Sequence, residues 1–301
     1  MFKVAVLLST FNGEKYILDQ LKSIKNQKKV RIKIFAIDDG SKDRTVKILK
    51  EFEIPKKIYK SKKFKNPVKN FLHLIDIVPS SYDFYCFADQ DDYWFYNKLS
   101  YSISKLLKHD AEICGSRTFY TNEKLQILRK SLLFKKKPCL RNALVQSITG
   151  GNTQVWTRKF NNILKKIKNK NPASHDWYLY QTATLFNFKF LYLKKPLVYY
   201  RQHKNNVIGS NTGFFNTFKR VYWGFSGRYK LWHDMNERHL KYIINHFNID
   251  KNNVDTINKF YKYRDQSLFN RINNYFLDLK VFRQTFNGNL MLFLALIFKK
   301  I

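Results

Sequence analysis

The chain has 301 residues, of which 44% are hydrophobic, so it is long enough to bury the core of one large domain and too apolar to be disordered. Lys and Arg number 56 against 22 Asp and Glu, which gives a formal net charge of +34 and predicts an anionic partner. The three cysteines lack the spacing of a metal or redox motif, which argues against a disulfide-rich secreted protein and favours a reducing cytosol.

The first predicted elements alternate between strands and helices. They are, in order, a strand at residues 4–8, a helix at 14–25, a strand at 32–37 and a helix at 45–52. Asp43 stands just before the second helix, where we expect it to act as the N-cap. Short strands alternating with helices are typical of a parallel sheet with right-handed crossovers.

Each of these two strands ends in a polar loop. Thr10 and Asn12 follow the first strand, and Asp38 and Asp39 follow the second. Because the carboxyl ends of parallel strands meet at the same edge of a sheet, we expect these side chains to converge. Carboxylates and amides pair with the ring N–H groups of a pyrimidine and with ribose hydroxyls, which predicts a nucleotide site. The alternative for the Asp38-Asp39 loop is a solvated turn that caps a helix.

The most acidic segment is the tetrapeptide that follows an aromatic run at residues 84–88. This run predicts a buried strand, and Asp89, Asp91 and Asp92 come directly after it. Carboxylates packed so closely repel one another unless a cation neutralises them, and oxygen ligands select a hard ion such as Mg²⁺ or Mn²⁺. We therefore expect a metal that bridges to substrate phosphates. A solvated acidic turn is the alternative.

Glycine-rich phosphate loops are absent from the sequence. It contains neither a GxGxxG nor a GxxxxGK pattern, and Gly13 and Gly40 stand alone in their loops. A dinucleotide site of the Rossmann type and a P-loop ATPase are therefore not supported.

Five segments occur in the order found in a known family. They are Leu8–Tyr16, Asp38–Ser41, Asp89–Trp94, His175–Trp177 and Tyr200–Gly209. On these motifs, residues 3–210 resemble family 2 glycosyltransferases with the GT-A fold, in the bacterial rhamnosyltransferase-like branch that builds surface polysaccharides. The resemblance implies an α/β nucleotide-diphospho-sugar transferase fold, with a mostly parallel sheet flanked by helices. It does not say which sugar is moved.

The resemblance also implies a reaction. A nucleotide-sugar, with UDP or dTDP as its nucleotide, would lose its sugar by direct displacement with inversion at the anomeric carbon. The acceptor would be a hydroxyl of a lipid-linked or oligosaccharide glycan. The implied roles are pyrimidine contact for Asp38 or Asp39, ribose or metal contact for Asp89, metal ligand for Asp91, base for Asp176, and metal or diphosphate contact for His203.

Elementary chemistry agrees with these roles. A leaving nucleoside diphosphate develops negative charge, which bound Mg²⁺ or Mn²⁺ neutralises without proton transfer. Arg201 offers further countercharge to the diphosphate. Two alternatives stay open, since Asp176 would also serve as a helix N-cap and His203 as a structural histidine. Residues 150–153 form either a plain turn or the acceptor contact that the resemblance implies.

The resemblance ends near residue 210. We expect a catalytic domain over residues 1–210 and a basic, aromatic, helical extension over residues 211–301. The apolar run at 290–298 precedes two lysines, and it is either an interfacial anchor at a membrane surface or a core helix. Its length is well below the roughly 18–20 apolar residues that span a bilayer.

The net charge favours an anionic membrane surface as partner over nucleic acid, because no RNA-binding or helix-turn-helix signature accompanies it. The first strand begins directly after residue 3, which leaves no room for a signal peptide. We expect a cytoplasmic enzyme, peripheral on the inner face of the cell membrane. The alternatives are a metal-dependent nucleotidyltransferase and a basic nucleic-acid-binding protein.

Overall fold

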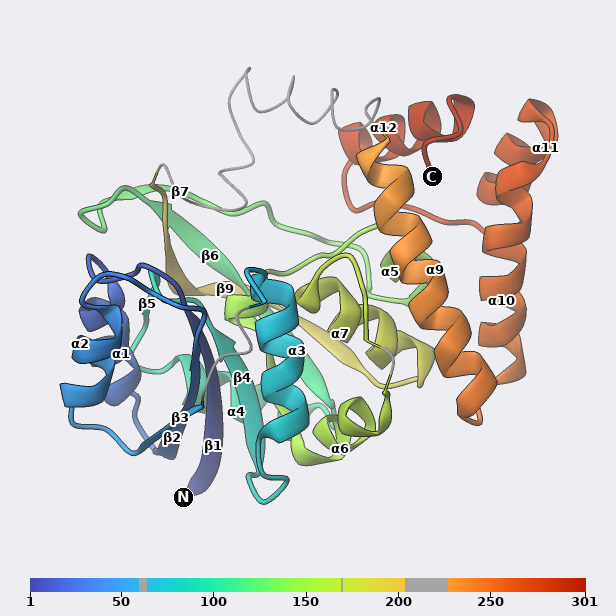
Figure 1. The fold of residues 1–301 in the computed structure, drawn as a ribbon. Coiled ribbons are helices and arrows are strands. Elements are labelled where there is room, and N and C mark those ends of the chain that lie inside the picture. Colours follow the sequence, from blue (N-terminus) through green and yellow to red (C-terminus); the bar gives the residue numbers. More distant parts are fainter. Residues whose placement is uncertain (60–63, 169, 204–226) are drawn as a thin grey trace. The chain divides into compact units, whose positions relative to one another are not determined.

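The structure is a computed structural model that describes residues 1–59, 64–168, 170–203 and 227–301. The chain forms two compact units, and segments distant in sequence contribute to each (Figure 1). The first unit comprises residues 1–133, 149–168 and 189–209. The second comprises residues 134–148, 169–188 and 210–301.

The first unit is built on one sheet. Its strands are β1 (Phe2–Thr10), β2 (Val30–Asp38), β3 (Lys56–Tyr59), β4 (Phe84–Ala88), β5 (Tyr93–Trp94), β6 (Ile113–Thr121), β7 (Ile127–Lys130), β8 (Val155–Thr157) and β9 (Phe190–Arg201). The strand order is β3-β2-β1-β4-β8-β6-β9-β5, with β7 paired to β6. Pairing is parallel from β3 through β4, whereas β8 runs antiparallel to both of its neighbours. The predicted α/β fold is confirmed. Parallel pairing also joins β6 to β9, whereas β5 is antiparallel to β9 and β7 is antiparallel to β6.

Helices cover both faces of this sheet. They are α1 (Ile17–Lys25), α2 (Thr45–Glu51), α3 (Pro67–Ile77), α4 (Lys98–Lys108) and α6 (Arg158–Lys166). Successive side chains of a strand point to opposite faces, and every residue from Val4 to Leu8 in β1 is 0% exposed. Both faces of β1 are therefore buried, which explains why its sequence is a continuous apolar run rather than an alternating one. In Figure 1, α3 stands beside α6 and α1 beside α2.

The predicted amino-terminal elements are present with small shifts. The runs at 4–8, 32–37 and 84–88 are the centres of β1, β2 and β4. One detail is wrong, because Arg44 and not Asp43 occupies the N-cap position of α2. Asp43 still satisfies an amide of the first turn, since its Oδ1 accepts the N–H of Thr45 at 3.0 Å.

The second unit is helical. Its helices are α5 (Leu140–Ala143), α7 (His175–Leu185), α9 (Arg228–His246), α10 (Lys251–Lys262), α11 (Leu268–Asn273) and α12 (Phe286–Ile297), with the turns η2 (Tyr263–Asp265) and η3 (Asn274–Asp278). The expected domain boundary at residue 210 lies outside the described residues. Helices α5 and α7, which precede residue 210, also belong to the second unit. Helix α7 packs on α9. The rings of Tyr178 and His239 lie 4.5 Å apart, and the Ala173 N–H donates to Asn236 Oδ1 at 3.1 Å.

The last helix, α12, has two unlike faces. Leu292 and Leu296 are 3% and 1% exposed, so this face packs into the second unit. On another face, Phe286 and Leu290 are 83% and 48% exposed. The apolar run is therefore part of the core along one side, and an anchoring role concerns its outer side alone. Within the described ranges, no helix is long and apolar enough to cross a membrane.

Candidate functional site

The loops after β1 and β2 are tied together at the carboxyl edge of the sheet. Thr10 pairs in register with Asp38, and its buried hydroxyl donates to Asp38 Oδ1 at 2.8 Å. The Ser41 hydroxyl donates to the same oxygen at 2.5 Å. The N–H groups of Gly40 and Ser41 donate to Oδ2 at 3.0 and 2.8 Å. Gly40 has a φ of +91°, which favours glycine and turns its N–H toward the carboxylate.

Asn12 and Asp39 belong to the same network. The Asn12 N–H donates to Ser41 Oγ at 2.8 Å, and its side-chain oxygen accepts the Lys42 N–H at 2.9 Å. Asp39 is 7% exposed, and its Oδ2 accepts the Asn66 N–H at 3.2 Å. The predicted convergence of the polar residues after β1 and β2 is therefore observed.

Gln90, which the sequence analysis did not single out, joins the loop after β4 to the loop after β1. Its Oε1 accepts the Phe11 N–H at 2.8 Å, and its Nε2 donates to the Phe11 carbonyl at 2.9 Å. A Cβ on Gly13 would lie 2.3 Å from Gln90 Oε1, so only glycine leaves room for this clamp. The lone glycine of the first loop was the one sequence signal of such a close approach.

Asp91 and His203 come together from positions 112 residues apart. Asp91 Oδ2 lies 2.7 Å from His203 Nε2, and the two side chains are 16% and 9% exposed. The Tyr16 ring stacks on the imidazole, with the ring centroids 4.9 Å apart. Asp89 follows β4 directly and is partly exposed. Residues 204–209 of the last sequence motif lie outside the described residues.

Arg201 binds the backbone of the Asp91 loop. It is 3% exposed, its Nε donates to the Asp91 carbonyl at 3.0 Å, and its Nη2 pairs with Asp19 Oδ2 at 2.9 Å. Its Nη1 donates to the Glu123 carbonyl. All three nitrogens thus bind groups of the chain. This placement does not fit the expected direct contact with a diphosphate, and it makes Arg201 a residue that positions the loop.

Asp92 is 0% exposed, whereas its two acidic neighbours Asp89 and Asp91 are partly exposed. Asn152, in the turn η1 (Gly151–Thr153), donates from Nδ2 to Asp92 Oδ2 at 2.5 Å. Burial raises the pKa of Asp92 well above its usual range, and the charges of Asp91 and Asp89 raise it further. Of the three carboxylates expected around one metal, Asp92 is therefore shielded from solvent, and only Asp89 and Asp91 are partly exposed.

A buried lysine completes this inner network. Lys98 is 0% exposed, its Nζ donates to the Asn152 carbonyl at 2.6 Å, and it lies 3.2 Å from the centroid of the Trp94 ring. Burial lowers the pKa of Lys98 to about 8, although the charge of Asp92 acts in the opposite direction. Asp92, Lys98 and Asn152 thus join the acidic loop, α4 and η1 below the surface.

The remaining donor set fits a divalent cation in its chemistry. Asp91 offers carboxylate oxygen and His203 an imidazole nitrogen, and Mn²⁺ accepts both ligand types. Within the described part of the chain, no group of three or more His, Cys, Asp or Glu side chains is arranged around a metal position. A small number of protein ligands is sufficient for an ion that completes its coordination shell with phosphate oxygens and water.

Asp176 lies in the second unit, at the start of α7. Ser174 occupies the N-cap position and the helix begins at His175, so the alternative role of Asp176 as N-cap is wrong. The Ser147 hydroxyl donates to Asp176 Oδ2 at 2.8 Å and orients the carboxylate. Burial lowers the pKa of the neighbouring His175, and the charge of Asp176 acts in the opposite direction.

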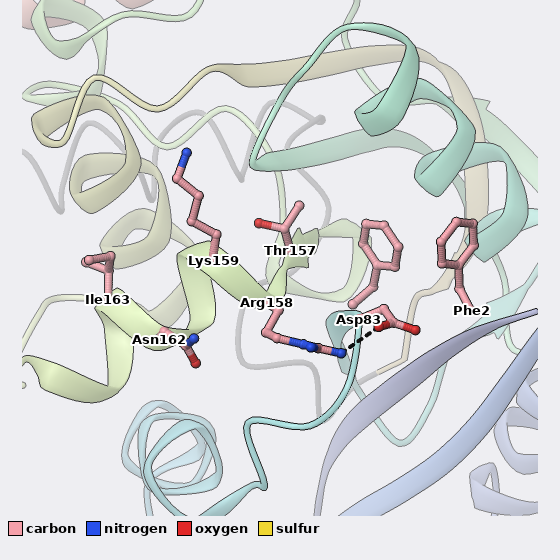
Figure 2. A pocket seen from close by; sticks show the side chains of 8 residues that line it. Phe2, Asp83, Thr157, Arg158, Lys159, Asn162 and Ile163 are labelled. Atoms are coloured by element: carbon pink, nitrogen blue, oxygen red, sulfur yellow. Dashed lines mark hydrogen bonds and ion pairs between the residues drawn. The ribbon is translucent and has the colours of Figure 1, made fainter.

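A pocket of about 650 Å³ lies at the opposite, amino-terminal edge of the sheet, where β1 and β4 begin (Figure 2). Its lining includes Asp83 and, from α6, Arg158. The two pair at 2.6 Å, and the Lys3 N–H donates to the other Asp83 oxygen at 2.9 Å. This carboxylate is neutralised by the chain itself, so the candidate site is at the carboxyl edge.

Comparison with known proteins shows which family the chain resembles. The model of Glycosyl transferase family 2 matches residues 5–193, a range that contains the loops after β1, β2 and β4 together with Asp176. The dTDP-rhamnosyl transferase RfbG of Shigella flexneri is 36% identical over 232 residues, which cover 71% of this chain and 78% of that protein.

Solved structures share the fold at low sequence identity. TarS 1–349 of S. aureus, in complex with UDP-GlcNAc, has a TM-score of 0.63 at 15% identity and covers 99% of this chain and 89% of its own. The mannosyltransferase PcManGT of Pyrobaculum calidifontis, in complex with GDP-Man and Mn²⁺, has a TM-score of 0.55 at 10% identity, over 96% of this chain and 78% of its own. The predicted GT-A fold is confirmed.

Proposed function

Because the chain belongs to glycosyl transferase family 2, we propose that it transfers a sugar, with inversion, from a dTDP- or UDP-sugar to a glycan hydroxyl in surface polysaccharide synthesis. A nucleotide-sugar glycosyltransferase is the activity that both the family and the relative carry. Neither supports a nucleotidyltransferase or a nucleic-acid-binding protein. The similarity to a dTDP-rhamnosyl transferase favours dTDP-rhamnose as donor.

The observation that carries this proposal is the meeting of three loops at one edge of the sheet. The loops after β1, β2 and β4 bring Asp38, Asp39 and Asp91 together, while His203 reaches Asp91 from the end of β9. In the proposed complex, Asp38 or Asp39 accepts from the pyrimidine N–H, Thr10 and Asn12 shape that pocket, and Asp89 meets the ribose.

In the same proposal Asp91 and His203 hold Mg²⁺ or Mn²⁺. A bound ion would supply Lewis-acid stabilisation of the leaving diphosphate. What the chain itself contributes is the orientation of these two ligands. Arg201 fixes the Asp91 backbone, and the Tyr16 ring fixes the imidazole plane of His203.

Asp176 is proposed as the base. A single displacement needs one group that accepts the proton of the acceptor hydroxyl, and it forms no covalent intermediate with the enzyme. The hydrogen bond from Ser147 fixes one oxygen of the carboxylate, and the group lies in the first turn of α7.

The proposed acceptor is lipid-linked or an oligosaccharide, and the proposed location is the cytoplasmic face of the cell membrane. The outer face of α12 supports membrane contact, because Phe286 and Leu290 are exposed there. Residues 279–301 contain four Lys and Arg and no Asp or Glu. An apolar face flanked by cations suits the interface of an anionic membrane.

The test is donor consumption by the full chain, without and with a glycan acceptor. A panel of dTDP-rhamnose, UDP-sugars and GDP-sugars is incubated with Mn²⁺ or with EDTA, and nucleoside diphosphate release is measured. We expect dTDP-rhamnose to be consumed with Mn²⁺ but not with EDTA. NMR of the product should show an inverted anomeric configuration. A retained configuration, or consumption of none of these donors, would overturn the proposal.

A further inference from the structure

The β6–β7 hairpin of the first unit exposes a group of apolar side chains. Among the strands of the described residues, β7 pairs with β6 alone. Its Ile127 and Leu128 are 52% and 61% exposed, and just beyond the strand Leu132 and Leu133 are 53% and 42% exposed. These four aliphatic side chains, within residues 127–133, are called the hairpin patch below.

The backbone that carries the hairpin patch is firmly held. The Ser131 N–H donates to the Thr118 carbonyl at 2.9 Å, and the Thr118 N–H donates to Ser131 Oγ at 3.1 Å. The Tyr192 hydroxyl donates to the Leu132 carbonyl at 2.8 Å. Because the chain is bonded on both sides of the exposed leucines, their outward placement is part of the fold. Exposed apolar patches of this kind mark interaction surfaces.

The patch lies within an exclusively basic stretch of sequence. Residues 124–175 contain no Asp or Glu. The cations nearest to the patch in the chain, within the same unit, are Lys124, Arg129 and Lys130. Arg129 and Lys130 lie over the rings of Tyr120 and Phe119, at 4.0 and 5.6 Å from the centroids. Cationic and apolar groups are therefore presented by one short segment.

The hairpin is joined to the candidate active site through one residue. The carbonyl of Glu123, in the turn between β6 and β7, accepts from Arg201, and Arg201 Nε donates to the Asp91 carbonyl at 3.0 Å. Lys15, in the loop after β1, also pairs with the Glu123 side chain. A surface that docks on the hairpin is thus held next to the carboxyl edge of the sheet.

We propose that the β6–β7 hairpin is a membrane-docking surface of the catalytic unit, in which the hairpin patch inserts among anionic lipid headgroups and the flanking lysines meet lipid phosphates. The value of this docking rests on the proposed function, since it would present a lipid-linked acceptor to the site. The docking itself does not require transfer. It is distinct from any contact that the outer face of α12 makes.

The chemistry of the patch favours lipid over other partners. Single-stranded nucleic acid is bound by aromatic stacking platforms in a basic groove, whereas the exposed groups here are aliphatic. A second copy of the chain would bring another net charge of +34 toward the same basic surface. An anionic membrane satisfies both the aliphatic and the cationic groups.

The experiment measures vesicle binding of the full chain by flotation, with phosphatidylcholine vesicles and with vesicles that contain about 30% phosphatidylglycerol. The test variant is Leu128→Ser/Leu132→Ser. The matched control is Leu107→Ser on α4, which removes a leucine of similar exposure (56%) from the same unit. Phe286→Ser/Leu290→Ser reports the contribution of α12, and circular dichroism melting checks that each variant is folded.

We expect the wild type to bind the anionic vesicles selectively, the hairpin variant to bind at least about tenfold more weakly, and the control to bind like the wild type. Equal binding by the hairpin variant and the wild type would overturn the proposal. So would a wild type that binds neither kind of vesicle. Donor consumption in solution is measured on the same proteins, so failure of the proposed transfer is seen separately.

Discussion

The two edges of the sheet both carry carboxylates, but they hold them differently. At the amino-terminal edge, Asp83 is paired with the guanidinium of Arg158, a full cation. At the carboxyl edge, Asp38 is held by two hydroxyls and two backbone N–H groups, and Asp91 by the imidazole of His203. The guanidinium nearest to Asp91, that of Arg201, is paired with Asp19.

This difference shows how a chain with a net charge of +34 keeps an acidic site. The hydroxyl and backbone N–H donors at Asp38 are neutral, so they fix the geometry of the carboxylate without cancelling its charge, whereas a lysine or arginine in contact would cancel it. In the proposed function, the charges of Asp38 and Asp91 at the carboxyl edge complement a metal ion and the N–H groups of a base. The amino-terminal edge has no such surplus at Asp83.

The largest expected effect is that of Asp91→Asn. The amide keeps the size of the side chain but is a poor ligand for a hard cation, so we expect turnover of the nucleotide-sugar to fall by about 10³-fold. The melting temperature should stay close to that of the wild type, because Asp91 is partly exposed. Steady-state kinetics and thermal melting measure the two effects. Wild-type turnover in this variant would remove Asp91 from the site.

The next prediction concerns stability, because Asp92 is fully buried whereas Asp91 is partly exposed. Lys98→Met removes the cation of the inner network and leaves the Asp92 carboxyl buried, so we expect the free energy of unfolding to fall by about 3 kcal/mol. Urea unfolding measures it. The double variant Asp92→Asn/Lys98→Met should regain most of the loss. If single and double variants unfold alike, the two residues are not coupled.

Asp176→Asn extends the comparison to the second unit. The amide keeps the hydrogen bond from Ser147 but accepts no proton, so we expect kcat to fall by about 10²-fold while donor binding is retained. Kinetics with a saturating donor and a glycan acceptor measure this. Ser147→Ala is the matched control for orientation, and its loss should be smaller. A variant with unchanged kcat would assign Asp176 a structural role.

The smallest expected effect is at the amino-terminal edge. Asp83→Asn removes a partly exposed ion pair with Arg158, so we expect a loss of about 1 kcal/mol or less in stability and turnover within about twofold of the wild type. The same two assays as for Asp91→Asn apply. A large loss of turnover here would contradict the distinction between the edges.

Sequence patterns were sufficient for the strands that position the site. β1 and β4 carry continuous apolar runs and β2 a mainly apolar one, each followed by a polar loop, and these features are local in the chain. The order of the strands predicted the meeting of Thr10 with Asp38 at one edge. The family motifs singled out Asp91 and His203, which the structure brings within 2.7 Å.

The supporting residues were not predictable from local patterns. Gln90 contacts Phe11 across 79 residues, Lys98 contacts Asn152 across 54, and Arg201 contacts Asp91 across 110. Each bond joins segments that only the fold brings together, so no local pattern shows the partner. The sequence singled out Arg201, but for countercharge to the diphosphate rather than for this contact. The inward turn of Asp92 has the same cause, because nothing in an acidic tetrapeptide shows which carboxylate faces the core.

The central claim is that the charge left at the carboxyl edge binds a divalent ion together with a nucleotide. Electron paramagnetic resonance of Mn²⁺ tests it directly, by titration of the ion into the wild type and Asp91→Asn with saturating dTDP. The account predicts about one bound Mn²⁺ per wild-type chain in the presence of dTDP and a strong loss in the variant. Equal Mn²⁺ binding by both proteins, or dTDP binding that EDTA leaves unchanged, would contradict it.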